Sequence, residues 1–169
     1  MKILKTLITN EGQDQDIHAG EAYSLWTQLI ARYDTAELID IFINLTKDND
    51  LKRLLKNGLN KTILPQIDRL EKAMQRYQVP LPPRQPKGTD FSVNMDIARD
   101  QGMFRIILSM TQTALSLHTK AINICTNNFL RNMFTDFLNE EIEIYNLLLE
   151  YGESKNWVYS APNYSNSST

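Results

Sequence analysis

Apolar residues recur at steps of three and four along most of this 169-residue chain, and that spacing limits the fold more than any other feature. No stretch of useful length alternates with the period of two that a strand requires, so the predicted fold class is all-α. We expect four long helices, and their approximate ranges are residues 16–46, 49–77, 90–125 and 128–152. Lys155 hints that the fourth helix ends slightly later than Gly152.

The first two predicted helices each contain an irregular point. In the first, Tyr33-Asp34-Thr35 indicates a break or kink, and the expected inner face consists of Ala22, Leu25, Trp26, Leu29, Ile30 and Tyr33. In the second, Gly58 costs ~1 kcal/mol relative to alanine, and Pro65 lacks a backbone donor. The apolar spacing resumes after Pro65, so we predict one kinked helix there rather than two.

A proline-rich segment, residues 79–89, separates the second helix from the third and holds four of the six prolines. In polyproline II form, its 11 residues reach ~34 Å, about the length of a helix bundle. This favours a crossover from one end of the bundle to the other; a surface loop or a proline-rich ligand for another domain are the alternatives. Four helices with one long crossover form a ferritin-like up-down bundle. We assign residues 1–159 to one such domain and predict a disordered Ser/Asn-rich tail at 160–169.

Composition excludes several classes of function. With 18 basic and 20 acidic residues, the net charge is -2, which argues against nucleic-acid binding. A single cysteine, Cys125, excludes an internal disulfide framework. The apolar runs are too short to span or insert into a membrane, and the first ten residues lack the core of a secretory signal, so we expect an unsecreted protein. The sequence contains no Gly-rich phosphate loop and no recognisable nucleophile turn.

Both histidines and two glutamates interrupt the apolar faces of the predicted helices: His18, Glu21, His118 and Glu141. Counting residues from the two hairpin turns places all four in roughly one layer of the bundle, whereas Asp100 falls some 20 Å away. Such a layer supplies four ligands suited to Fe, Mn or Zn. The alternatives are a hydrogen-bonded His–Glu cluster without metal, or a layer that grips a small molecule. No Glu-x-x-His pair is present, which counts against a dimetal centre.

Short motifs in a fixed order resemble the spore coat protein F-like family of endospore-forming bacteria. The resemblance covers about residues 14–164, and the motifs are His18–Ala22 with Leu25-Trp26, Lys47–Leu55, Pro80–Pro83, Lys155–Trp157 and Ala161–Tyr164. It implies a ferritin-like four-helix fold, a role in the spore coat or in sporulation, and a location in the mother-cell cytoplasm or the coat. It transfers no catalytic residue.

Two functional hypotheses follow from the sequence. The first is a non-enzymatic bundle that associates with itself, as a C2 homodimer, and with other spore coat proteins. The second is a metalloprotein with Fe, Mn or Zn at His18, Glu21, His118 and Glu141. The absence of a catalytic motif favours the first.

Overall fold

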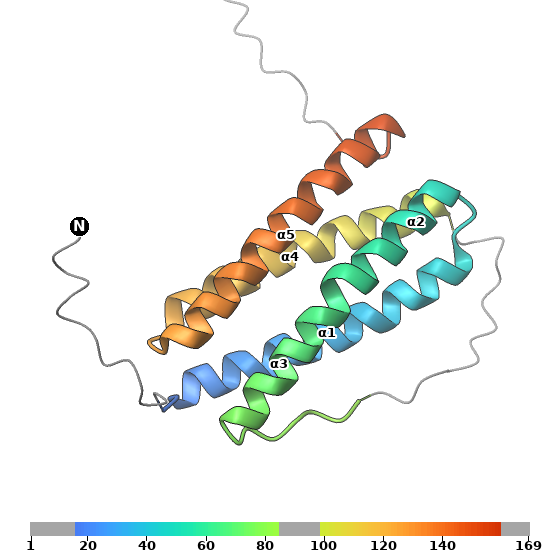
Figure 1. Cartoon of the computed structure of the whole chain (residues 1–169). Helices are drawn as coiled ribbons and strands as arrows, with labels where there is room; N and C mark the ends of the chain where they lie inside the picture. The colour runs from blue at the N-terminus through green and yellow to red at the C-terminus, as the bar shows by residue number, and fades with distance from the viewer. Residues whose placement is uncertain (1–15, 85–98, 160–169) are drawn as a thin grey trace, which may run out of the picture.

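The computed structural model describes residues 16–84 and 99–159, and within these ranges the chain is helical without a strand (Figure 1). The elements are α1 (Ala19–Leu45), α2 (Asn49–Gly58), the π-helical turn η2 (Leu59–Ile63), α3 (Leu64–Arg76), α4 (Asp100–Ile124) and α5 (Asn128–Ser154). The all-α prediction is confirmed. The predicted tail at 160–169 lies outside the described residues.

The start of α4 lies beside the start of α2, which fixes the topology. The carboxylate of Asp100 accepts hydrogen bonds from the backbone N–H groups of Lys47 (3.0 Å) and Asp48 (2.8 Å). At ~1.5 Å per residue, α3 ends about 42 Å from that point. The end of α3 and the start of α4 therefore lie at opposite ends of the bundle, as a crossover requires (Figure 1). The helix start predicted near residue 90 lies outside the described residues; α4 itself begins at Asp100, after Arg99 in extended conformation.

One continuous helical rod is formed by α2, η2 and α3, as predicted, and Pro65 explains its π turn. Proline has no N–H to donate, and its ring clashes with the carbonyl of an ordinary α-helical turn. The turn is widened so that the Leu64 N–H reaches back to the Leu59 carbonyl, and Pro65 then falls in the first turn of α3. Of the break or kink predicted near Tyr33, the break is wrong, because α1 continues without interruption from Ala19 to Leu45. The Thr35 hydroxyl donates to the Ala31 carbonyl at 2.6 Å within this helix.

The inner face of α1 differs from the predicted one. Trp26, expected inside, is 40% exposed, whereas Arg32 is only 4% exposed. The physical reason is that α1 buries a row of polar residues beside its leucines. A search for apolar spacing does not count these polar residues, and it therefore selects a face that is rotated toward solvent relative to the buried one. The buried residues of this row are Glu21, Ser24, Gln28 and Arg32. Further along the same helix, Ile39 and Phe42 are buried in the conventional apolar way.

The C-terminal end of α5 packs on the start of α4. Phe104, Tyr151 and Trp157 have ring centroids 5.7–5.8 Å apart. Gly152 lies against this group, and a Cβ there would clash with Phe104. Gly152 thus permits close packing and does not end the helix, which continues to Ser154 as the position of Lys155 indicated.

Candidate functional site

Three charged or titratable side chains meet in the centre of the bundle: Arg32 from α1, His118 from α4 and Glu141 from α5. One guanidinium nitrogen of Arg32, Nη2, lies 2.5 Å from His118 Nε2 and 2.7 Å from Glu141 Oε2. The exposed fractions of the three residues are 4%, 0% and 2%. We call these three residues the central cluster. It links α1 to the α4–α5 hairpin within the core.

The hydrogen bonds of the central cluster determine the protonation of His118. A guanidinium only donates, so Nε2 of His118 must accept and the proton of the neutral ring must lie on Nδ1. Nδ1 is buried, and no described residue accepts its hydrogen bond. Burial lowers the pKa of His118 below its usual 6.5, and the positive charge of Arg32 acts in the same direction. His118 is therefore a neutral acceptor at pH 7.

Glu141 carries the balancing negative charge. Burial raises the pKa of Glu141, but its contacts in the central cluster, above all the positive Arg32 guanidinium that donates to Oε2, hold that pKa below its usual 4.5. The cluster thus contains one positive and one negative group, both removed from water. Breaking such a buried pair on one side costs more than the pair contributes, because the remaining charge stays buried.

The other predicted pair, His18 and Glu21, forms an N-terminal cap at the end of the bundle. The His18 backbone N–H donates to Glu21 Oε2 at 2.9 Å, and the Gly20 N–H donates to His18 Nδ1 at 3.0 Å, which completes a capping box. Glu21 Oε1 accepts from the backbone N–H groups of Thr126 and Asn127, both at 2.7 Å. We call this set the end cap. It fastens the start of α1 to the turn between α4 and α5.

The end cap satisfies Glu21 through backbone donors rather than through a counter-charge. Burial raises the pKa of Glu21, but the N–H groups of Asn127, His18 and Thr126 outweigh it and leave the pKa below 4.5. His18 Nδ1 accepts, so its Nε2 carries the proton that faces the Ile124 carbonyl at 3.3 Å. A Cβ at Gly20 would come within 3.0–3.1 Å of the His18 ring, so a larger residue there would require the ring to move by a few tenths of an ångström.

The four residues predicted to share one layer therefore lie as two separate pairs. The structure brings His118 and Glu141 together, with Nε2 and Oε2 3.6 Å apart, and it brings His18 to Glu21 at the end of α1. Sequence reasoning missed Arg32, although a signal was present. Arg32 lies seven residues after Leu25 and seven before Ile39, both buried, and this is the spacing of one helix face.

The central cluster does not fit a metal ion as it is arranged. A ligand set on His118 and Glu141 would place the ion between Nε2 and Oε2, and the Arg32 guanidinium takes that position. In the two described ranges, no three side chains of His, Cys, Asp or Glu group as a metal would require. As arranged within these ranges, the predicted ligands offer neither a free position nor a third acidic or imidazole group, and a metal centre stays a prediction.

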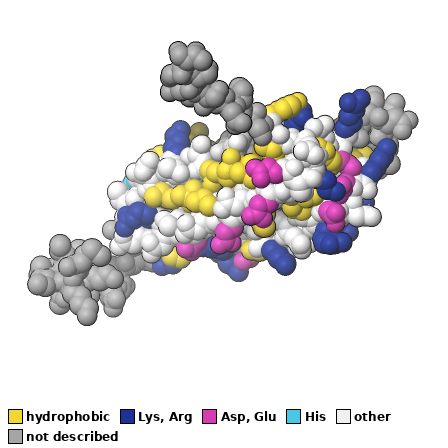
Figure 2. All heavy atoms as spheres, turned by 90° about the horizontal axis from the view of Figure 1, so that it is seen from above, with side chains coloured by type: hydrophobic (Ala, Val, Ile, Leu, Met, Phe, Trp, Pro, Cys, Tyr) yellow, Lys and Arg dark blue, Asp and Glu magenta, His cyan; other side chains and the backbone are white. Residues whose placement is uncertain are grey.

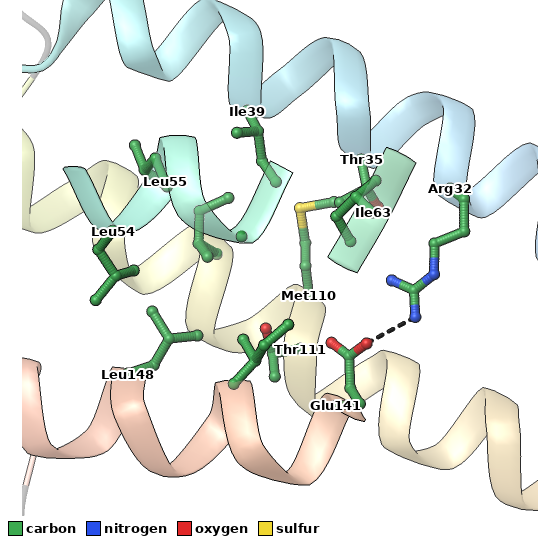
Figure 3. Close-up of a pocket in the computed structure, with 13 residues that line it drawn as sticks. Arg32, Thr35, Ile39, Leu54, Leu55, Ile63, Met110, Thr111, Glu141 and Leu148 are labelled. Carbon is green, nitrogen blue, oxygen red and sulfur yellow. Dashed lines mark hydrogen bonds and ion pairs between the residues drawn. The ribbon is translucent and has the colours of Figure 1, made fainter. Parts of the chain in front are cut away.

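A small cavity adjoins the central cluster (Figure 3). Arg32 and Glu141 form its polar side, and Thr111 contributes a hydroxyl group. The remaining wall is mostly apolar and comes from α1, α2, η2, α4 and α5. No helix within residues 16–84 and 99–159 has the length and apolar character to cross a bilayer.

Fold and topology define the class of this protein: it is a ferritin-like helical bundle with a long crossover between two antiparallel hairpins. The chain belongs to the family described as Protein of unknown function (DUF3231), whose model matches residues 6–169. "Uncharacterized protein YvdQ" of Bacillus subtilis (strain 168) is 26% identical over 88 residues, and that match spans 52% of this chain and 51% of YvdQ.

Solved structures share the fold across most of the chain. A "putative spore coat protein" from Bacillus halodurans C-125 has a TM-score of 0.82 at 24% identity. This match covers 91% of this chain and 99% of the Bacillus halodurans chain. A two-domain protein from Anabaena variabilis, with DJ-1/ThiJ/PfpI-like and ferritin-like domains, has a TM-score of 0.67 at 13% identity. That match covers 99% of this chain and 52% of the Anabaena protein, so this chain spans about half of it.

Proposed function

We propose that this protein is a sporulation-associated component of the spore coat that acts without catalysis, by associating through exposed helix faces. The observation that supports the proposal most is the correspondence with the Bacillus halodurans protein, which extends over 91% of this chain and 99% of that one. The buried polar groups fit this role, because both clusters connect helices and neither presents a reactive group in an open cleft.

Exposed apolar side chains on α4 and α5 supply points of contact for association. On α5, Ile142 is 43% and Leu147 58% exposed, and on α4 Ile106 is 48% exposed. Figure 2 shows hydrophobic side chains running along the face seen there, with acidic side chains beside them. A symmetric dimer through such a face is the simplest closed assembly, and coat proteins would be the further partners.

The experiment follows the protein through sporulation and in solution. We expect an antibody to detect it in coat extracts of purified spores and not in vegetative cells. In vitro, light scattering coupled to size exclusion should give a dimer that Ile142→Lys and Leu147→Lys weaken. Tyr23→Lys is the matched control, because Tyr23 is 65% exposed but lies on α1. A monomer at high concentration that is absent from spores would refute the proposal.

The alternative proposal is a metalloprotein with the ion held by His118 and Glu141. It requires the Arg32 guanidinium to leave the position between them. Elemental analysis of untagged protein purified without chelator decides it. Near-stoichiometric Fe, Mn or Zn that His118→Ala removes would establish a metal site and displace the structural interpretation of the cluster.

A further inference from the structure

The cavity beside the central cluster has the size of a site for a very small molecule. Its volume is about 40 Å³, counted as the space open to the centre of a water-sized sphere. Since one water needs ~10–15 Å³ on that measure, the space equals roughly three waters. Ile39, Leu55 and Leu148 are buried in its wall, whereas Leu54 and Ile144 are partly exposed. The cavity is therefore not sealed from solvent.

Two polar oxygens in this cavity have no partner among the described residues. Glu141 Oε2 accepts a hydrogen bond from Arg32, and the other carboxylate oxygen of Glu141 points into the cavity (Figure 3). Thr111 is 5% exposed, and no described group bonds its hydroxyl. Other helical threonines differ in this respect, since Thr27 and Thr113 donate to the carbonyl four residues earlier at 2.9 and 3.0 Å. The two unused oxygens point to a molecule that supplies the missing hydrogen bonds.

Charge and hydrogen-bonding capacity specify the chemistry of that molecule. Arg32 and Glu141 already compensate each other and His118 is neutral, so a charged ligand would bring an uncompensated charge into a buried site. A carboxylate oxygen only accepts, so the ligand must donate. We propose that the cavity binds a small uncharged molecule with an apolar body and one hydroxyl group, which donates to Glu141 and contacts the Thr111 hydroxyl.

The backbone on the α2–η2 side leaves room for such a ligand. Gly58 lines the cavity, and a Cβ built there would meet no atom within 4 Å. Packing therefore does not demand a glycine, although glycine weakens a helix interior. The adjoining π turn widens the helix before Ile63, another lining residue. Both features keep this wall free of bulk.

The test compares two solvents of equal size, propan-2-ol and acetone, by NMR titration of the methyl-labelled full chain. Both have four heavy atoms, but only propan-2-ol can donate a hydrogen bond. We expect saturable shifts at the methyl groups of Ile39, Ile107 and Leu148, with millimolar affinity for propan-2-ol. Binding of acetone should be at least about tenfold weaker, the usual effect of one net hydrogen bond to a charged group.

Two isoleucines provide a matched pair of variants. Ile144→Phe fills the cavity and should abolish the shifts from both solvents, whereas Ile30→Phe on α1 adds the same bulk outside the cavity and should leave them unchanged. Should Ile144→Phe fail to fold, Thr111→Val should weaken propan-2-ol binding severalfold. Unsaturable shifts, equal affinity for both solvents, or unchanged binding in the folded Ile144→Phe protein would each overturn the proposal. None of these results affects coat association, which depends on exposed faces.

Discussion

The molecule contains two His–Glu pairs, and the two pairs differ in burial, in histidine tautomer and in the group that completes them. In the end cap, the His18 side chain is 45% exposed, whereas the His118 side chain of the central cluster is 0% exposed. The tautomers are opposite: His18 accepts on Nδ1, and His118 accepts on Nε2. The third partner decides the difference, since backbone N–H groups complete the end cap and a guanidinium completes the central cluster.

This contrast predicts how each pair fails. Backbone N–H groups stabilise the Glu21 carboxylate, and these donors remain in place if the Glu21 side chain is changed. A single side chain, Arg32, compensates the charge of Glu141, so one substitution at Arg32 leaves an unpaired charge in the core. Removing a partner should therefore cost most in the central cluster and least at the solvent-facing His18.

The largest effect is expected for Arg32→Met, which keeps the apolar stem of the side chain and removes the guanidinium. The Glu141 carboxylate would remain buried without its counter-charge, and we expect the free energy of unfolding to fall by about 3–5 kcal/mol. Urea unfolding followed by circular dichroism measures this. Arg53→Met is the control, because Arg53 is 75% exposed and 3.9 Å from Asp50; it should cost no more than ~0.5 kcal/mol.

A double substitution sharpens the interpretation of that loss. If the penalty comes from the orphaned carboxylate, Arg32→Met combined with Glu141→Met should regain most of the lost stability, because no charge is then left in the core. A double variant as unstable as the sum of the single variants would show that packing, rather than charge pairing, determines the loss.

In the end cap, Glu21→Gln should cost about 2 kcal/mol. Glutamine keeps one oxygen that accepts hydrogen bonds, but its NH₂ group would face backbone N–H groups that now donate to Glu21. The substitution also removes the negative charge that strengthens these hydrogen bonds. Thermal unfolding at pH 7 measures the loss. Glu143→Gln on the exposed side of α5 is the matched control and should be close to neutral. Equal stability of the two variants would contradict the assigned role of Glu21.

The central cluster should also make stability depend on pH. Burial holds the folded-state pKa of His118 below 6.5, so the unfolded chain takes up a proton that the folded chain does not. Stability should therefore fall as the pH drops below about 6.5, by at most ~1.4 kcal/mol per pH unit. The lowered pKa values of Glu21 and Glu141 act only below about 4.5. His118→Gln should flatten the curve between pH 6.5 and 5, and a flat wild-type curve there would refute this prediction.

The sequence predicted the helices and their connectivity better than it predicted the cluster. Helix type follows from local spacing, and the long crossover follows from a proline-rich segment of known reach. The prediction that four polar residues share one layer failed in axial height, because Glu21 bonds to the turn at Thr126 and Asn127, about 12 Å along the bundle from His118. Including Trp26 rotated the predicted inner face of α1 toward solvent, and a search limited to apolar residues does not select Arg32. The seven-residue spacing of Arg32 from both Leu25 and Ile39 indicates that Arg32 lies on the buried face.

The smallest effect is expected at His18, where two substitutions separate capping from burial. Asparagine is a strong N-cap residue whose side-chain oxygen can accept from the Gly20 N–H, so His18→Asn should change stability by no more than ~0.5 kcal/mol. His18→Ala removes the acceptor and should cost about 1 kcal/mol. Chemical unfolding of both variants at pH 7 measures the difference. If His18→Asn cost as much as His18→Ala, the contact of the imidazole with Ile124 would matter more than the cap, and the end cap would resemble the central cluster more closely than its exposure indicates.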